Sequence, residues 1–147
     1  MKVEIHKTKS FRFTTKYISQ LFATISRVLP RSRQGEVSVA FVDDRAMRQL
    51  NKQYRCIDKV TDVLSFAERE SAGYQQQSKY LGEIVIAYPY AHKQARLQKH
   101  SLRSEIVMLL IHGFLHLVGY DHRTQAQEAV MKKWEQKVLM EFEKMNA

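Results

Sequence analysis

The sequence predicts an α+β fold, in which a small mixed β-sheet of about four strands is covered by about five helices. The 147 residues suffice for one domain with a substantial core, and 44% apolar against 27% charged residues is ordinary for a globular protein. Four strand-length segments alternate or are continuously apolar, and five longer ones repeat apolar residues at helical spacing. No repeat or linker interrupts residues 1–147, so we expect a single domain.

The chain begins with a predicted strand and a predicted helix. Residues 2–6 alternate apolar and polar side chains, as a short strand does. The Thr14–Thr15 pair can cap a helix that runs to Leu29, with apolar residues along one face. Pro30 is expected to end this helix, because the residue before a proline is pushed out of helical conformation.

A second strand and a second helix follow. Residues 36–42 alternate again, and Asp43 or Asp44 can cap the helix that comes next. The residues of this helix that we expect to face inward are Met47, Leu50 and Tyr54.

The middle of the chain predicts two more strands separated by polar segments. Residues 55–61 have no periodicity and predict a loop, and 62–66 predict a short strand. Residues 71–79 are polar and rich in Gln, so they form the segment most expected to be mobile. Residues 81–88 are apolar on both faces at their centre, which is typical of a strand in the middle of a sheet.

Three helices complete the predicted fold. Residues 89–99 carry a proline in the first turn of the first one, and Ser101 caps a second, almost wholly apolar helix. Thr124 and Gln127 form a capping box for the last helix, which runs through Met145. Its expected buried face consists of Val130, Met131, Trp134, Val138 and Phe142.

A group of histidines lies in and after the apolar helix. His112 and His116 are four residues apart and therefore share one helix face. Gly119 takes positive φ without strain, so the helix can end there and the chain can turn back to bring His122 to the other two. Three neutral imidazoles make an open tetrahedral metal site. The sequence thus predicts that these three histidines bind one divalent ion at the end of a buried helix.

The same spacing also matches a metalloprotease signature, in which Glu follows the first His and acts as the general base. Gly113 stands in that position, which disfavours peptide hydrolysis but leaves the metal ligands intact. Asp121, beside His122, can orient a ligand imidazole, can serve as the missing general base, or can be a simple turn residue. The sequence leaves these three roles open.

The net charge of +9, from 24 Lys and Arg against 15 Asp and Glu, predicts a polyanionic partner, nucleic acid before membrane. Two basic clusters stand out: Arg27, Arg31 and Arg33, and Lys93, Arg96, Lys99, His100 and Arg103. Cys56 is the single cysteine, which excludes an internal disulfide and fits a reducing compartment. Residues 1–6 do not resemble a signal peptide, and no apolar run is long enough to cross a bilayer. We therefore expect a cytoplasmic protein with no membrane partner.

The chain resembles the YbeY family of bacterial metal-dependent endoribonucleases in three stretches. They are Tyr54-Arg55 followed by Thr-Asp-Val-Leu-Ser-Phe at 61–66, then Leu-Gly-Glu-Ile-Val-Ile at 81–86, and finally the three-histidine segment at 112–122. In length and order the resemblance covers nearly the whole chain. It implies that His112, His116 and His122 bind the metal, with zinc as the expected ion.

The resemblance also implies that Arg55 is functionally important. We expect Arg55 to clamp the scissile phosphate, because a guanidinium binds phosphate oxygens with two prongs. The implied function is a single-strand-specific, metal-dependent endoribonuclease of residues 1–147 that acts in ribosomal RNA processing, small-subunit rRNA 3′-end maturation and ribosome quality control. The implied partners are RNA, the ribosome or pre-ribosomal particles, ribosomal proteins and assembly GTPases.

Two other functions remain open at this point. One is a zinc-stabilised RNA- or ribosome-binding assembly factor without catalytic activity, although three ligands without a fourth argue against a purely structural zinc. The other is a metal-dependent hydrolase of a small molecule or peptide, which the glycine at 113 and the charge of +9 disfavour. It also remains open whether the ion activates a water, polarises a phosphate oxygen or helps to deprotonate a 2′-hydroxyl.

Overall fold

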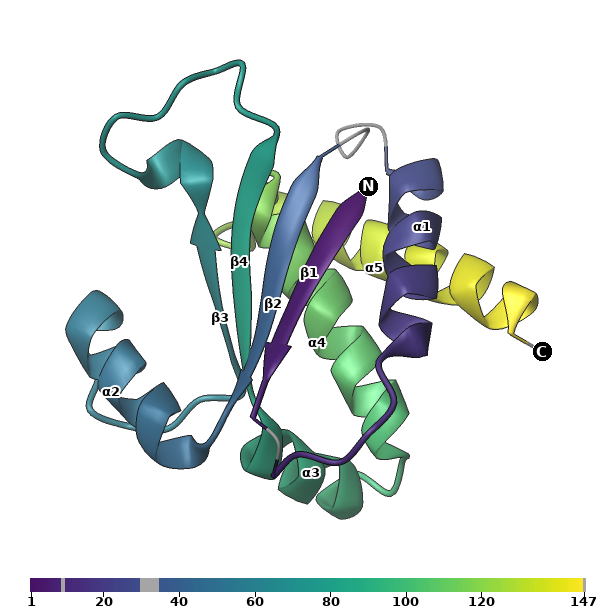
Figure 1. The fold of residues 1–147 in the computed structure, drawn as a ribbon. Coiled ribbons are helices and arrows are strands. Elements are labelled where there is room, and N and C mark those ends of the chain that lie inside the picture. The colour runs from purple at the N-terminus through teal and green to yellow at the C-terminus, as the bar shows by residue number, and fades with distance from the viewer. Residues whose placement is uncertain (9, 30–34, 147) are drawn as a thin grey trace.

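The computed structural model describes residues 1–8, 10–29 and 35–146 (Figure 1). The elements are β1 (Lys2–Lys7), α1 (Lys16–Val28), β2 (Glu36–Val42), α2 (Asp44–Arg55), β3 (Val63–Ala67), the short 3₁₀ helix η1 (Glu68–Glu70), β4 (Tyr80–Ala87), α3 (Tyr88–Leu97), α4 (Leu102–Leu117) and α5 (Gln125–Met145). Within these ranges the four predicted strands and five predicted helices are confirmed. Pro30, Arg31 and Arg33, which were assigned to a helix end and a basic cluster, lie outside the described residues.

The four strands form one mixed sheet in the order β1-β2-β4-β3 (Figure 1). β1, β2 and β4 are parallel, and β3 runs antiparallel to β4. Helix α1 makes the crossover from β1 to the parallel strand β2, as parallel neighbours require. In this order β3 is an edge strand of the sheet, and the carbonyl of its residue Ser65 accepts a hydrogen bond from Arg55 of α2.

Helices cover both faces of the sheet. α1, α4 and α5 pack on one face, where Ile84 and Ile86 of β4 join the larger core. α2 packs on the other face, where Met47 contacts the smaller core of Leu64 and Val85. Successive side chains of a strand point to opposite faces, so a strand buried on both sides needs a continuous apolar run. This explains the sequence of β4.

Side chains at the helix starts confirm most of the predicted caps. Asp43 accepts a hydrogen bond from the third backbone N–H after it at 2.8 Å, and Ser101 does the same at 3.0 Å. Thr124 and Gln127 form both hydrogen bonds of the capping box. Thr15 occupies the N-cap of α1, but its side chain makes no capping hydrogen bond.

Two expected core residues lie at the surface. Tyr54, in the last turn of α2, is 53% exposed although its ring packs edge-on with Phe66 of the edge strand β3. Arg55 is the final residue of the helix rather than the start of a loop. Val130 is 47% exposed, because α5 packs through the neighbouring positions Met131 and Val138. Among the residues described, no helix combines the length and the apolar character that a membrane crossing needs.

Candidate metal centre

The end of α4 brings the third histidine back to the first two. The N–H of Gly119 donates to the carbonyl of His116 at 3.1 Å, and the N–H of Tyr120 donates to the carbonyl of Leu115 at 2.9 Å. These two bonds are those of a Schellman motif, which requires the left-handed conformation that Gly119 adopts with φ of 103°. The chain turns back there and carries His122 over the helix end, which confirms the turn predicted from Gly119.

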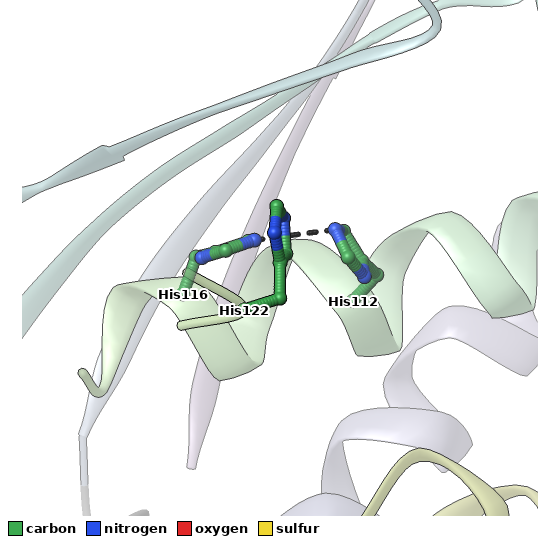
Figure 2. Close-up of side chains that lie close together, drawn as sticks. All are labelled: His112, His116 and His122. Carbon is green, nitrogen blue, oxygen red and sulfur yellow. Dashed lines mark hydrogen bonds between the residues drawn. The ribbon is translucent and has the colours of Figure 1, made fainter. Parts of the chain in front are cut away.

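The three imidazoles converge on one point (Figure 2). His112 and His116 project from successive turns of α4, and His122 approaches both from the returning chain. One ring nitrogen from each residue can be chosen so that the three lie within 4.8 Å of one another. The Nε2 atoms of His112 and His116 are 3.2 Å apart. Two nitrogens bound to one tetrahedral zinc-sized ion lie about 3.3 Å apart, so this pair already has the spacing that an ion requires.

The protonation state of His116 favours metal binding. Burial lowers the pKa of this ring, and the nearby rings of His112 and His122 lower it further. The carboxylate of Asp121 and a backbone hydrogen bond with Tyr120 act in the opposite direction but do not reverse the shift. His116 is therefore neutral at pH 7, which is the form that ligates a metal ion.

Glu135 is a residue of this site that the sequence reasoning missed. Its Oε1 lies 3.3 Å from Nδ1 of His112. A carboxylate only accepts, so the bond fixes the tautomer with the proton on Nδ1 and leaves Nε2 free to face His116. The sequence contains one sign of this role: Glu135 lies on the buried stripe of α5, four residues after Met131 and three before Val138.

A cavity of about 380 Å³ opens beside the histidines, between α4 and α5. Its lining consists of His112, His122, Glu128, Met131, Lys132 and Glu135. Lys132 lies 3.1 Å from Glu128 within this wall. The histidine group is thus accessible on the side of α5, which a water molecule or a substrate group needs in order to reach it.

Asp121 stabilises the turn that carries His122. Its Oδ1 accepts a hydrogen bond from the backbone N–H of His122 at 2.8 Å, and its Oδ2 lies 3.0 Å from Nε of Arg123. The backbone hydrogen bond lowers the pKa of this carboxyl, as does the charge of Arg123. Both oxygens bind groups of their own turn, which favours the turn role among the three that the sequence left open.

Arg55 is the last residue of α2, which packs on the face of the sheet opposite to α4. Hydrogen bonds nevertheless connect Arg55 to α4. Its Nη2 donates to the carbonyl of Ser65 in β3 at 2.7 Å, and its Cζ lies 5.2 Å from the ring centre of Phe66. The hydroxyl of Ser65 in turn donates to the carbonyl of Gly113. Two hydrogen bonds therefore separate Arg55 from the residue next to His112.

Position 113 has no room for a catalytic side chain. A Cβ atom on Gly113 would lie 2.9 Å from Cγ2 of Ile84 and 3.1 Å from Oγ of Ser65. This side of α4 faces the sheet, whereas the neighbouring His112 faces α5. The Glu of the metalloprotease signature would collide with β3 and β4, so the structure gives a physical reason for its absence.

The predicted basic cluster at 93–103 lies at the far end of α4 from His116. Arg103 is nine residues before His112, a distance of about 14 Å along a helix. Lys93, Arg96 and Lys99 are exposed. His100 is not a free cation in this cluster, because its Nε2 is 2.5 Å from the carboxylate of the buried Glu105.

The fold and the site together define a small α+β protein with a three-histidine group that can hold a metal ion. Among the described residues, no other group of His, Cys, Asp or Glu side chains could do so. Residues 2–143 match the family described as Endoribonuclease YbeY. The chain belongs to the YbeY family, which confirms the resemblance seen in the sequence.

Relatives and a solved structure cover most of the chain. The Endoribonuclease YbeY of Desulforamulus reducens is 45% identical over 111 residues, 74% of this chain and 72% of that protein. The Endoribonuclease YbeY of Moorella thermoacetica is 41% identical over 133 residues, 82% of this chain and 85% of that protein. The solution structure of TM1509 from Thermotoga maritima aligns with a TM-score of 0.62 and 25% identity over 97% of this chain and 92% of that one. The fold is therefore shared beyond the sequence motifs.

Proposed function

We propose that residues 1–147 form one metal-dependent endoribonuclease domain, in which His112, His116 and His122 hold a single divalent ion, zinc. The observation that carries this proposal is the convergence of three ring nitrogens within 4.8 Å on a helix that β3 connects to Arg55. The curated relatives are named endoribonucleases, and the charge of +9 suits an RNA substrate.

The chain's own residues have distinct tasks in this proposal. An ion bound by the three histidines would supply a Lewis acid beside the scissile phosphodiester. Glu135 keeps His112 in the tautomer that offers Nε2, and Asp121 holds the turn of His122 in place. Arg55 binds the phosphate, since the carbonyls of Ser65 and Tyr54 occupy two donors and a guanidinium has five N–H groups.

The proposal extends to the substrate and the setting. The substrate is single-stranded ribosomal RNA, cleaved in small-subunit rRNA 3′-end maturation and in ribosome quality control. The partners would be the ribosome or its precursors, ribosomal proteins and assembly GTPases, and the cytoplasm is the location that this role requires. Family membership supports this part, and RNA processing within a ribosomal particle would supply the specificity that a small domain lacks.

The decisive experiment compares ribosomal RNA cleavage by the wild type, His116→Ala and His6→Ala, with metal content and melting temperature recorded for each. His6 is an exposed histidine of β1 and serves as the control. We expect His116→Ala to be folded, metal-poor and inactive, and His6→Ala to be unchanged. A metal-poor variant that cleaves as fast as the wild type would refute the proposal. If all three proteins bind RNA but none cleaves it, the result would favour the alternative function of an RNA-binding assembly factor without catalytic activity.

A further inference from the structure

The exposed ring of Tyr54 is a feature that the metal centre does not explain. This tyrosine is 53% exposed at the end of a strongly polar helix, although its spacing from Met47 predicted a core position. Departures from local sequence rules often mark functional positions. Tyr54 also directly precedes Arg55, the residue proposed to bind the phosphate.

Tyr54 and Arg55 are held against the same aromatic ring. The ring centres of Tyr54 and Phe66 are 5.2 Å apart, in an edge-on arrangement of 73°. The Cζ of Arg55 lies 5.2 Å from the centre of the same Phe66 ring. Phe66 itself is fixed in β3, opposite Glu83 of β4. The end of α2 therefore presents an aromatic ring and a cation side by side against one strand of a packed sheet.

This pair matches the two chemical parts of a nucleotide. An unpaired base stacks on an aromatic side chain, and its phosphate binds a guanidinium. We propose that Tyr54 is a stacking platform for an unpaired RNA base beside the phosphate bound by Arg55. The inference rests on the proposed function and adds a binding subsite to it. Because a base inside a duplex cannot stack on a side chain, the subsite also explains a preference for single strands.

Hydrogen bonds of β3 link the Tyr54–Arg55 pair to the histidine helix α4. Ser65 bonds to Gly113 beside His112 on one side and to Arg55 on the other, and Tyr54 follows next. Strand β3 therefore holds the Tyr54–Arg55 pair in a fixed relation to the helix that carries His112 and His116. An apolar peptide could cover the ring of Tyr54, but it would leave the cation beside it without an anion. Charge complementarity therefore favours a nucleotide as the occupant.

The test uses a single-stranded RNA that carries 2′-O-methyl groups to resist cleavage and 2-aminopurine at one position after another. Stacking quenches the fluorescence of 2-aminopurine, so the wild type should quench it at one position. Tyr54→Phe should keep this quenching, and Tyr54→Ala should lose it and bind the RNA roughly tenfold more weakly. In cleavage assays Tyr54→Ala should raise KM with little change in kcat. Tyr74→Ala removes another exposed tyrosine, 41% exposed, and should behave as the wild type.

Several outcomes would overturn the inference. Equal quenching and equal KM in Tyr54→Ala, in a protein that cleaves RNA, would refute the subsite and leave the proposed function intact. An equal loss in Tyr54→Phe would assign the effect to the hydroxyl rather than to stacking. An equal loss of quenching and affinity in Tyr74→Ala would show that the effect of removing a tyrosine is not specific to position 54. A wild type that neither binds nor cleaves RNA would refute both the subsite and the proposed function. Melting temperatures of all variants identify a loss that is due to unfolding.

Discussion

The hydroxyl of Ser65 donates a hydrogen bond to the carbonyl oxygen of Gly113 at 3.1 Å, which joins the edge strand β3 to the histidine helix α4. The two residues are 48 positions apart in the sequence. The close approach is possible because Gly113 has no side chain, and a Cβ there would meet both Ser65 and Ile84. The spacing between the proposed metal site and Arg55 therefore depends on this contact.

Gly113→Ala should destabilise the protein by up to about 2 kcal/mol. Alanine gains about 1 kcal/mol of helix propensity over glycine, but forcing a methyl group against the fully buried Ile84 costs more, about 1–3 kcal/mol. Urea denaturation measures the change. Met108→Ala, on the exposed side of the same helix, is the control and should stay within about 0.5 kcal/mol of the wild type. A stabilised Gly113→Ala would contradict the packing described here.

Glu135→Ala should weaken zinc binding by about 10- to 100-fold, because His112 loses the carboxylate that fixes its tautomer. Glu135→Gln retains an acceptor oxygen and should lose less. Competition with a chelator of known affinity measures both variants. Glu143, an exposed residue of the same helix, provides the control Glu143→Ala. Unchanged affinity in Glu135→Ala would mean that the contact with His112 has no part in metal binding.

Arg55→Ala should reduce RNA cleavage by at least about 100-fold, because it removes the bidentate contact proposed between Arg55 and a phosphate in the transition state. Metal content should stay at the wild-type level, because Arg55 reaches the histidine helix only through Ser65. Arg55→Lys keeps the charge without the fork and should be intermediate. Loss of metal together with activity would instead assign Arg55 a structural role.

The buried phenol of Tyr17 should lower the free energy of unfolding at alkaline pH. Burial in the core raises the pKa of its phenol to about 12, although the guanidinium of Arg103, 5.0 Å from the ring, lowers it. The unfolded chain loses this proton near pH 10, and the folded chain keeps it. The free energy of unfolding should therefore fall between pH 10 and 12, by up to about 1.4 kcal/mol per pH unit from this group.

Urea denaturation of the wild type and of Tyr17→Phe at pH 9, 10 and 11 isolates this contribution. The difference between the two proteins should be constant up to pH 10 and then move in favour of Tyr17→Phe. Absorbance at the wavelength of tyrosinate should show a phenol that titrates near pH 12 in the wild type and is missing in Tyr17→Phe. Parallel curves for the two proteins over the whole range would refute the assignment.

The sequence by itself determined those features of the fold and of the histidine site that depend on residues close together in the chain. The helical spacing of His112 and His116, the turn at Gly119 and the return of His122 all lie within one helix end, where backbone geometry leaves few alternatives. The helix caps at Asp43 and Ser101 were predictable for the same reason, since a cap joins groups three residues apart. Periodicity likewise gave each strand and helix its place in the chain.

Only the tertiary structure decided which elements meet. The contact of Glu135 with His112 spans 23 residues and that of Ser65 with Gly113 spans 48, and neither follows from a local pattern. Tyr54 has core spacing, but it packs against Phe66 of the edge strand β3, where the sheet ends, and its ring stays 53% exposed. The physical reason is that periodicity tells which side of an element is apolar, whereas the packing of distant elements determines what covers that side and where the cover ends.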